Sequence, residues 1–164
     1  MPEERARPLR RSPAAPARAL QAAVVLVGAA ALAFLLLEPL VEGRNAQATL
    51  FATYFKDPFL AFVYLGSVPF FVALRQAFTA LGLVGRGEAA SPRVEAALRT
   101  IKVCALAVIG FVAVGEVVIV TSGSDDHAGG VMMGLLVASG AAVAATAAAL
   151  FERVHRDAVA KRRP

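Results

Sequence analysis

Four long apolar segments constrain this chain more than any other feature of its sequence. A transmembrane helix needs about 20 predominantly apolar residues, and backbone groups in hydrocarbon must be paired within the protein. Runs of this length without alternating polarity predict helices rather than a barrel. We therefore expect an all-α integral membrane protein with four transmembrane helices, at about residues 19–37, 59–78, 103–120 and 131–151.

The composition of the chain also favours a membrane protein. Hydrophobic residues make up 58% of its 164 residues, and only 18% are charged. A chain of this size has too much surface to hide so many apolar side chains in one core. The formal net charge of +5 does not indicate direct nucleic-acid binding, because the basic residues gather at the ends of the apolar segments.

The lysines and arginines are shared unequally among the flanks of these segments. Fifteen of the 17 lie in the N-terminal tail, between Arg75 at the end of the second segment and Lys102 before the third, or in the C-terminal tail. The other two are Arg44 and Lys56, between the first and second segments. Positively charged flanks stay in the cytoplasm, so we predict cytoplasmic N and C termini and a multi-pass protein of the cell (plasma) membrane. A signal peptide cleaved near Ala46–Ala48 is the disfavoured alternative, because the first apolar run is long and acidic residues follow it.

Residues outside the apolar segments complete the expected domain organisation around a membrane domain at 19–151. Residues 1–18 are rich in Pro, Ala and Arg and are expected to form a disordered basic cytoplasmic tail. Residues 152–164 are expected to form a second basic cytoplasmic tail. The N-terminal tail is expected to lie next to the lipid bilayer, where basic residues are attracted to anionic lipid.

The segment between the second and third apolar runs carries clear helix boundaries. Three glycines, at positions 82, 85 and 87, are expected to end the second helix. Ser91 and Pro92 are typical of an N-cap and a first helical position. We therefore expect the third helix to begin at Pro92, with residues 92–102 as a cytoplasmic helical stalk that faces lipid or a partner.

Three blocks of this sequence resemble a known bacterial family. They are LGSVPFFVALRQAF from Leu65, SPRVEAALRTIKVCALAVI from Ser91 and SDDHAGGVMMGLL from Ser124. The family, of small four-span membrane proteins, is catalogued as family 2975 of the domains of unknown function. The resemblance implies no established activity. It also implies a partnership with a small helix-turn-helix regulator, because such genes often lie beside those of the family.

The polar turn TSGSDDHAGG, from Thr121 to Gly130, is the first candidate site. Asp125 and Asp126 precede the fourth apolar segment, where carboxylates favour the positive end of a helix dipole and cap its free N–H groups. Ion binding is the alternative. It is disfavoured because adjacent side chains diverge and because His155 is expected on the other side of the membrane. Where this chain has His127, Ala128 and Gly129, the family has Ala-Pro-Gly, so a site built on the histidine is the weaker hypothesis.

Glu116 is the only acidic residue inside an expected span. A charge at mid-bilayer costs at least about 2.5–3.5 kcal/mol, and intramembrane acids are functional candidates by default. Glu116 lies only four residues before Val120, so it can also snorkel to the interface or bond a neighbouring helix. We favour a packing role over proton or cation coupling, because the expected spans contain no second acid or buried base for a relay.

Two further candidates lie in the second apolar segment. Pro69 removes a backbone hydrogen bond and should kink the helix, with Ser67 and neighbouring helices compensating. Gln76 lies where this helix leaves the membrane. It matches a glutamine of the family, which assigns it no role.

Small residues recur every four positions in the fourth segment. Gly130, Gly134 and Ala138 form one series, and Gly140, Ala144 and Ala148 form another. Such series let helices approach closely, either within the chain or in a homo-oligomer. Their spacing does not distinguish these two possibilities.

Motifs that carry enzymatic chemistry are not found in the sequence. It has no Gly-rich phosphate loop and no nucleophile constellation, so we expect neither an enzyme nor a catalytic, cofactor or metal site. The favoured hypothesis is a non-enzymatic bacterial membrane protein that acts through protein–protein interaction, as a regulatory or sensory partner. The alternative is a small transporter or channel that uses Glu116.

Overall fold

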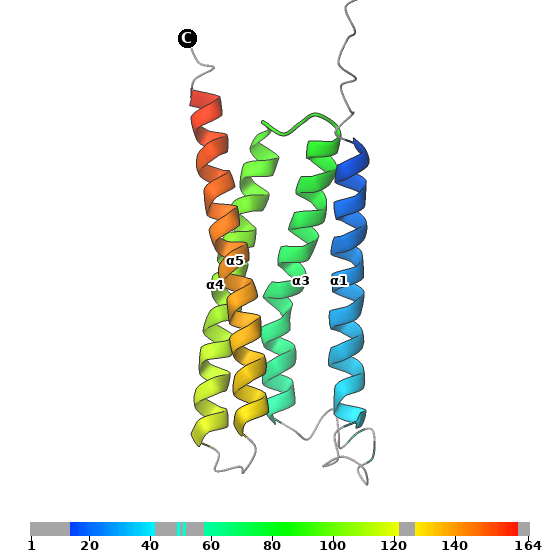
Figure 1. Cartoon of the computed structure of the whole chain (residues 1–164), viewed down its shortest axis with the longest axis vertical. Helices are drawn as coiled ribbons and strands as arrows, with labels where there is room; N and C mark the ends of the chain where they lie inside the picture. Colours follow the sequence, from blue (N-terminus) through cyan, green and yellow to red (C-terminus); the bar gives the residue numbers. More distant parts are fainter. Residues whose placement is uncertain (1–13, 42–48, 50, 52–57, 122–126, 161–164) are drawn as a thin grey trace, which may run out of the picture.

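The computed structural model describes residues 14–41, 49, 51, 58–121 and 127–160, and its regular structure consists of four long helices (Figure 1). These are α1 (Ala14–Val41), α3 (Pro58–Gly85), α4 (Pro92–Thr121) and α5 (His127–Ala160). Each is long and apolar enough to cross a membrane. The expected all-α architecture with four spans is confirmed.

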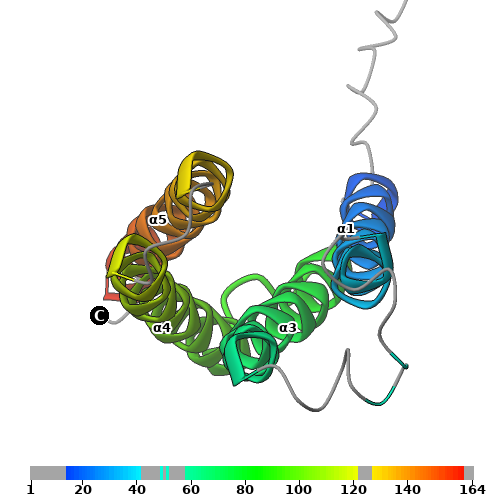
Figure 2. The ribbon, with the colours of Figure 1, turned by 90° about the horizontal axis from the view of Figure 1, so that it is seen from below.

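The four helices pack in chain order into an open arc. Neighbouring pairs are α1–α3, α3–α4 and α4–α5, and Figure 2 shows α1 and α5 at the two ends of the arc. The start of α1, the connection 86–91 and the end of α5 all lie at one end of the molecule (Figure 1), which we call the basic end. The helices contain 28 to 34 residues. At 1.5 Å per residue they exceed the roughly 30 Å of hydrocarbon and extend beyond it.

The outward surfaces of these helices are apolar. Leu26 is 70% exposed, Val143 is 71% exposed, and many other large aliphatic side chains are similarly open. A soluble protein rarely exposes apolar patches of this extent. The exposed surface is therefore suited to lipid tails rather than water.

Helix α4 packs on both sides and supplies about half of the buried apolar side chains of the described residues. Toward α3, Phe111 lies against Gly66, and the rings of Phe62 and Phe111 are 5.3 Å apart between centroids. Gly115 faces Phe62, where an added Cβ would stand 3.5 Å from the ring. Glycine thus leaves room at two points where an aromatic ring crosses between the helices.

Toward α5, α4 meets a seam of small residues. Gly130 lies against Ile119 and Gly134 against Glu116, while Ala145 and Ala148 are buried. These α5 positions follow three- and four-residue spacing, as expected for one face of a helix in a close pair. The small residues let the two backbones approach.

The two series of small residues in α5 therefore have different surroundings. Gly130 and Gly134 contact α4, whereas a Cβ built on Gly140 meets nothing within 4 Å. Ala144 is exposed, and Ala148 is buried. Packing within the chain accounts for the two glycines of the first series and for the last member of the second.

Helices α1 and α3 are joined at three levels. Near the basic end, a Cβ added to Gly85 would stand 2.9 Å from the Cβ of Ala17, and Gly82 lies against Gln21. The Gln21 amide also donates to the carbonyl of Phe78 at 3.0 Å. The glycines at 82 and 85 therefore lie where α1 and α3 approach closely, and Gly85 is also the last residue of α3. In the middle, Gly28 faces the Leu74 side chain.

At the far end, a proline in α1 determines the third junction. Pro39 is fully buried within the helix, and its missing N–H leaves the carbonyl of Leu35 without its usual helical donor. The Tyr64 hydroxyl donates to that carbonyl at 3.1 Å. A neighbouring helix thus satisfies a backbone group that hydrocarbon could not.

The connection 86–91 begins with a glycine C-cap. Gly87 has φ +82°, its N–H bonds the Val84 carbonyl at 3.0 Å, and the Glu88 N–H bonds the Leu83 carbonyl at 3.0 Å. These two bonds define a Schellman motif, which requires a left-handed residue. Of the three glycines in the predicted stop signal, the one at 87 has the left-handed conformation that caps α3, two residues after the last helical residue.

Helix α4 begins at Pro92, but its cap differs from the expected one. The Ser91 carbonyl accepts the Val94 N–H at 3.0 Å. The Ser91 hydroxyl is buried without a hydrogen-bond partner among the described residues. The N-cap prediction is therefore wrong for the side chain, because the hydroxyl does not reach the free N–H groups of the first turn.

The helices also extend into the expected tails. Helix α1 starts at Ala14, so residues 14–18 are helical rather than disordered. Helix α5 continues to Ala160, so residues 152–160 prolong the fourth span instead of forming a separate tail. Contacts made by Ala17 and Glu152, both buried, fix these extra turns.

Candidate functional site

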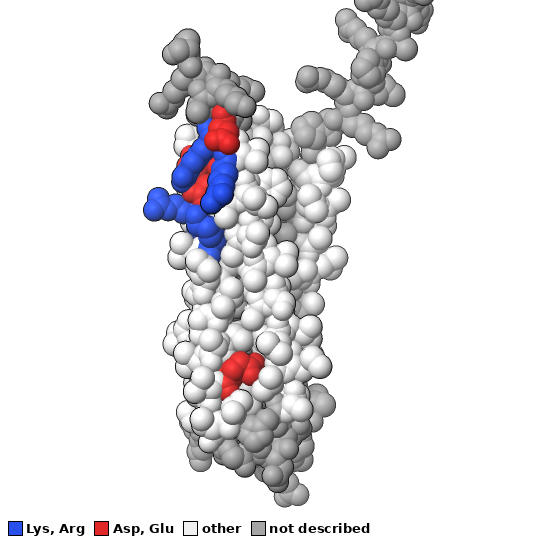
Figure 3. All heavy atoms as spheres, turned by 60° about the vertical axis from the view of Figure 1, so that its left-hand side comes forward, with Lys and Arg blue, Asp and Glu red and all other residues white. Residues whose placement is uncertain are grey.

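Charged side chains from α4 and α5 gather at the basic end of the arc. Glu95, Arg99 and Lys102 are four and three residues apart, so they share one face of α4. Glu152 and Arg156 are one helical turn apart on the antiparallel neighbour α5. Figure 3 shows this mixed basic and acidic patch above a largely uncharged surface. We call Glu95, Arg99, Lys102, Glu152, Arg153 and Arg156 the charged cluster.

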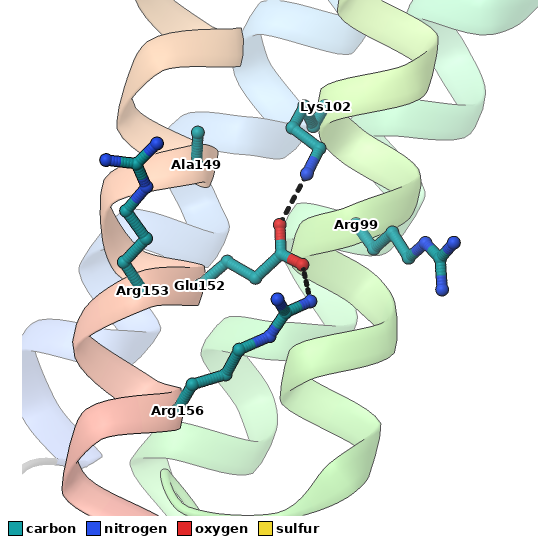
Figure 4. A pocket seen from close by; sticks show the side chains of 6 residues that line it. All are labelled: Arg99, Lys102, Ala149, Glu152, Arg153 and Arg156. Carbon is teal, nitrogen blue, oxygen red and sulfur yellow. Dashed lines mark hydrogen bonds and ion pairs between the residues drawn. The ribbon is translucent and has the colours of Figure 1, made fainter.

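A chain of ion pairs links the two helices (Figure 4). Lys102 Nζ donates to Glu152 Oε2 at 2.6 Å. Arg156 Nη2 donates to the other oxygen of Glu152, and its Nε donates to Glu95 Oε1 at 2.9 Å. The order Lys102–Glu152–Arg156–Glu95 alternates in charge and crosses twice between the helices.

Glu152 is the centre of this chain. It is only 4% exposed and is the one buried charged residue in the described part of the protein. A carboxylate is rarely buried unless it is paired and hydrogen-bonded. Lys102 and Arg156 each bind one of its two oxygens, so removal of either cation would leave a buried acceptor poorly compensated.

The cluster surrounds a recess of about 520 Å³. Its lining consists of Arg99, Lys102, Ala149, Glu152, Arg153 and Arg156. Arg99 and Arg153 flank the Lys102–Glu152 pair from opposite sides (Figure 4), and both are exposed. Neither forms an ion pair with another described residue. The arrangement is suited to binding an anion at a positively charged surface.

Metal chemistry finds no support in the described residues. They contain no group of three or more His, Cys, Asp or Glu side chains that could hold an ion. Asp125 and Asp126, the predicted cap of α5, lie outside the described residues. His127 is the first residue of α5, and His155 lies 28 positions later on the same helix, which is about 42 Å along its axis. A site that combines the two histidines is therefore excluded.

Glu116 lies at the α4–α5 seam, toward the end of the molecule opposite the basic end. A Cβ built on Gly134 would overlap its Oε1 and stand 2.8 Å from its Cδ. The same Cβ would be 3.3 Å from Cγ1 of Val112. The carboxyl group thus occupies the space that glycine leaves on the facing helix.

Pro69 and Gln76 both lie in α3, away from Glu116. Pro69 is half-buried within the helix, and Gln76 is half-buried one turn before the buried Ala80. The α3 residue level with Gly115 is Phe62, which is 14 positions, or about 21 Å, from Gln76. The structure therefore does not bring Pro69, Gln76 and Glu116 together into one site.

Ser67 does not compensate the backbone hydrogen bond that Pro69 removes in the way predicted. The carbonyl that loses its donor is that of Leu65, four residues earlier. The Ser67 hydroxyl instead donates to the carbonyl of Tyr64 at 2.7 Å. Ser67 therefore bonds a neighbouring carbonyl and not the one that Pro69 leaves free.

The charged cluster is the feature that sequence reasoning missed. The charge distribution identifies its basic members only as topology signals, and the expected tail at 152–164 includes Glu152. Two weak signals were present, namely the four-residue spacing of Glu152 and Arg156 and the shared helical face of Glu95, Arg99 and Lys102. Both patterns are common on solvated helices, so spacing alone does not reveal that Glu152 is buried.

Comparisons with known proteins agree with this architecture. The chain matches the family described as "Protein of unknown function (DUF2975)" over residues 14–163, which confirms the resemblance seen in the sequence. It is similar to the "Uncharacterized membrane protein YoaS" of Bacillus subtilis (strain 168), with 31% identity over 142 residues. That match covers 85% of this chain and 89% of the relative. No solved structure matches the chain.

Proposed function

Because the chain belongs to the DUF2975 family of membrane proteins, we propose that it is a non-enzymatic membrane protein that binds another protein through its basic end. In this role it is a regulatory or sensory partner. The observation that carries the proposal is the rigid, charged surface that α4 and α5 build where they leave the apolar region.

The first turns of α4 supply the contact surface. Val94 and Ala97 are buried, and the ion pair from Glu95 to Arg156 ties the same turns to α5. Arg93, Ala96 and Arg99 are exposed on the outer side. A helix held in place loses little conformational entropy when it binds, and an exposed basic face favours an acidic partner surface.

The partner is expected to be a cytoplasmic protein, and the resemblance points to a small helix-turn-helix regulator. This requires the basic end to face the cytoplasm, as the distribution of lysine and arginine predicts. A reporter that is active only in the cytoplasm should work when fused after Pro164 and fail when inserted after Ser124. Activity only after Ser124 would show that the predicted orientation is wrong. The basic end would then face away from the cytoplasm, and a cytoplasmic partner could not bind it.

Crosslinking in cells tests the partnership directly. A photoreactive residue at Ala96, exposed on the outer side of α4, should capture the regulator. The same residue at Val114, 54% exposed within the apolar part of α4, is the matched control and should not. Repeated capture of this chain alone at Ala96 would contradict the proposal and favour a homo-oligomer.

The transport alternative gains no support from the surroundings of Glu116. Its carboxyl group packs on the Gly134 backbone, an arrangement that favours close contact between α4 and α5. We therefore assign Glu116 a packing role within the proposed function.

A further inference from the structure

A second recess adjoins the charged cluster on its apolar side. It has a volume of about 390 Å³ and lies between α4 and α5. Its apolar wall contains Leu106, Ala145, Ala149 and Leu150, with Thr146 beside them. Lys102, Ala149 and Arg153 line both recesses. The two spaces therefore adjoin, and we call them together the groove, which has a charged end and an apolar end.

The position of this groove matches the boundary of a bilayer. On α4 the apolar run begins at Val103, directly after Lys102. On α5 the apolar run ends at Phe151, directly before Glu152. The charged end therefore lies at the level of lipid headgroups, and the apolar end lies within the hydrocarbon.

The charges at the junction favour an anion. Arg153 forms no ion pair with a described residue, so its guanidinium is free to bind a phosphate in two-point geometry. Lys102 donates one hydrogen bond to Glu152, and its ammonium has three donors. Arg99 adds a further positive charge at the rim of the polar recess.

We propose that this groove binds one anionic phospholipid. Arg153 and Lys102 bind the phosphate at the junction, and an acyl chain lies in the apolar recess beside Leu106 and Thr146. The paired carboxylate of Glu152 holds Lys102 in place for this contact. A free phosphate ion could use the charged end but would leave the apolar recess empty, so the two-part groove favours the lipid.

Lipid binding is measured by native mass spectrometry of the purified chain during titration with phosphatidylglycerol or phosphatidylcholine. The dissociation constant of the first bound lipid should be lower for phosphatidylglycerol. Arg153→Gln should raise that constant about fivefold, since one basic residue near an anionic surface contributes at about that level. Arg93→Gln removes an equal charge from an exposed α4 position outside the groove. This variant should change the dissociation constant little.

The apolar end is tested with a second pair of variants. Thr146→Phe places a ring in the apolar recess and should weaken phosphatidylglycerol binding. Val143→Phe, at an exposed position of the same helix outside the recess, should not. Inorganic phosphate in excess should fail to displace the lipid. Thermal unfolding followed by circular dichroism checks that all four variants fold alike.

Three results would overturn the proposal. Equal losses for Arg153→Gln and Arg93→Gln would show general surface attraction instead of a site. Unchanged binding by Thr146→Phe would show that no acyl chain occupies the apolar recess. Displacement by inorganic phosphate would make the ligand a free anion. Each measurement uses the purified chain alone, so its outcome is independent of the protein partner proposed above.

Discussion

The close contact between Glu116 and Gly134 leads to a quantitative prediction. In Gly134→Ala, the new methyl group would overlap Oε1 of Glu116 and press on its Cδ, 2.8 Å from the ideal Cβ position. The carboxyl group must then leave the seam, or the helices must separate. Overpacking of this kind costs about 1–3 kcal/mol, whereas the change from glycine to alanine within a helix contributes about 1 kcal/mol of stabilisation.

The two effects combine to a net loss of about 1 kcal/mol in the free energy of unfolding, taking the middle of that range. Glu116→Ala removes the overlapping group. In that background Gly134→Ala should stabilise the protein by up to about 1 kcal/mol. The coupling between the two positions is therefore about 2 kcal/mol, within the range measured for residues in contact.

The assay is reversible unfolding in mixed micelles with increasing sodium dodecyl sulfate, for the wild type, both single variants and the double variant. Gly140→Ala is the matched control, because it lies on the same helix with nothing within 4 Å of its Cβ position. It should be neutral or stabilising in either background. Additive effects of Gly134→Ala and Glu116→Ala would refute the packing role of Glu116 and reopen the transport alternative.

Three further predictions concern other junctions of the fold and use the same unfolding assay. Tyr64→Phe should lower the free energy of unfolding by about 1 kcal/mol. The Leu35 carbonyl, which Pro39 leaves without a helical donor, would lose its hydrogen bond from Tyr64. Gly87→Ala should lower the free energy of unfolding by about 1–2 kcal/mol, since φ is +82° there. Gly110→Ala, in open space, should not lower it. Equal effects of the two substitutions would contradict the C-cap. Glu152→Gln should lower the unfolding midpoint more than Glu88→Gln, whose ion pair is exposed; equal shifts would deny that the buried carboxylate joins α4 to α5.

The helices themselves could be predicted from the sequence. Pro92 marks the start of α4 because its missing N–H and fixed φ suit a first helical position. The apolar length of each span follows from the bilayer, which leaves an isolated chain few alternatives to a helix. The helix ends were less predictable, because apolarity stops at the headgroups while the helix continues. The end of the apolar run therefore predicts a tail that begins at Glu152, whereas α5 continues to Ala160.

The faces of the helices could not be predicted in the same way. Two series of small residues in α5 were equally suited to close packing, and only the packed structure places Gly134 against α4 and leaves Gly140 open. The glycines at 82 and 85 matched a helix stop as well as they matched a close approach to α1. Spacing identifies which residues share a face, but it does not identify what that face contacts.

The sequence by itself determined the four long helices of the described residues and which parts of them are apolar. Those properties are local, because each helix satisfies most of its backbone groups within one continuous segment of chain. Only the tertiary structure decided which side chains meet, because partners far apart in sequence are selected by helix register. Lys102 and Glu152 are 50 residues apart, and the part-buried pair that they form exists only because α4 and α5 pack antiparallel in this register.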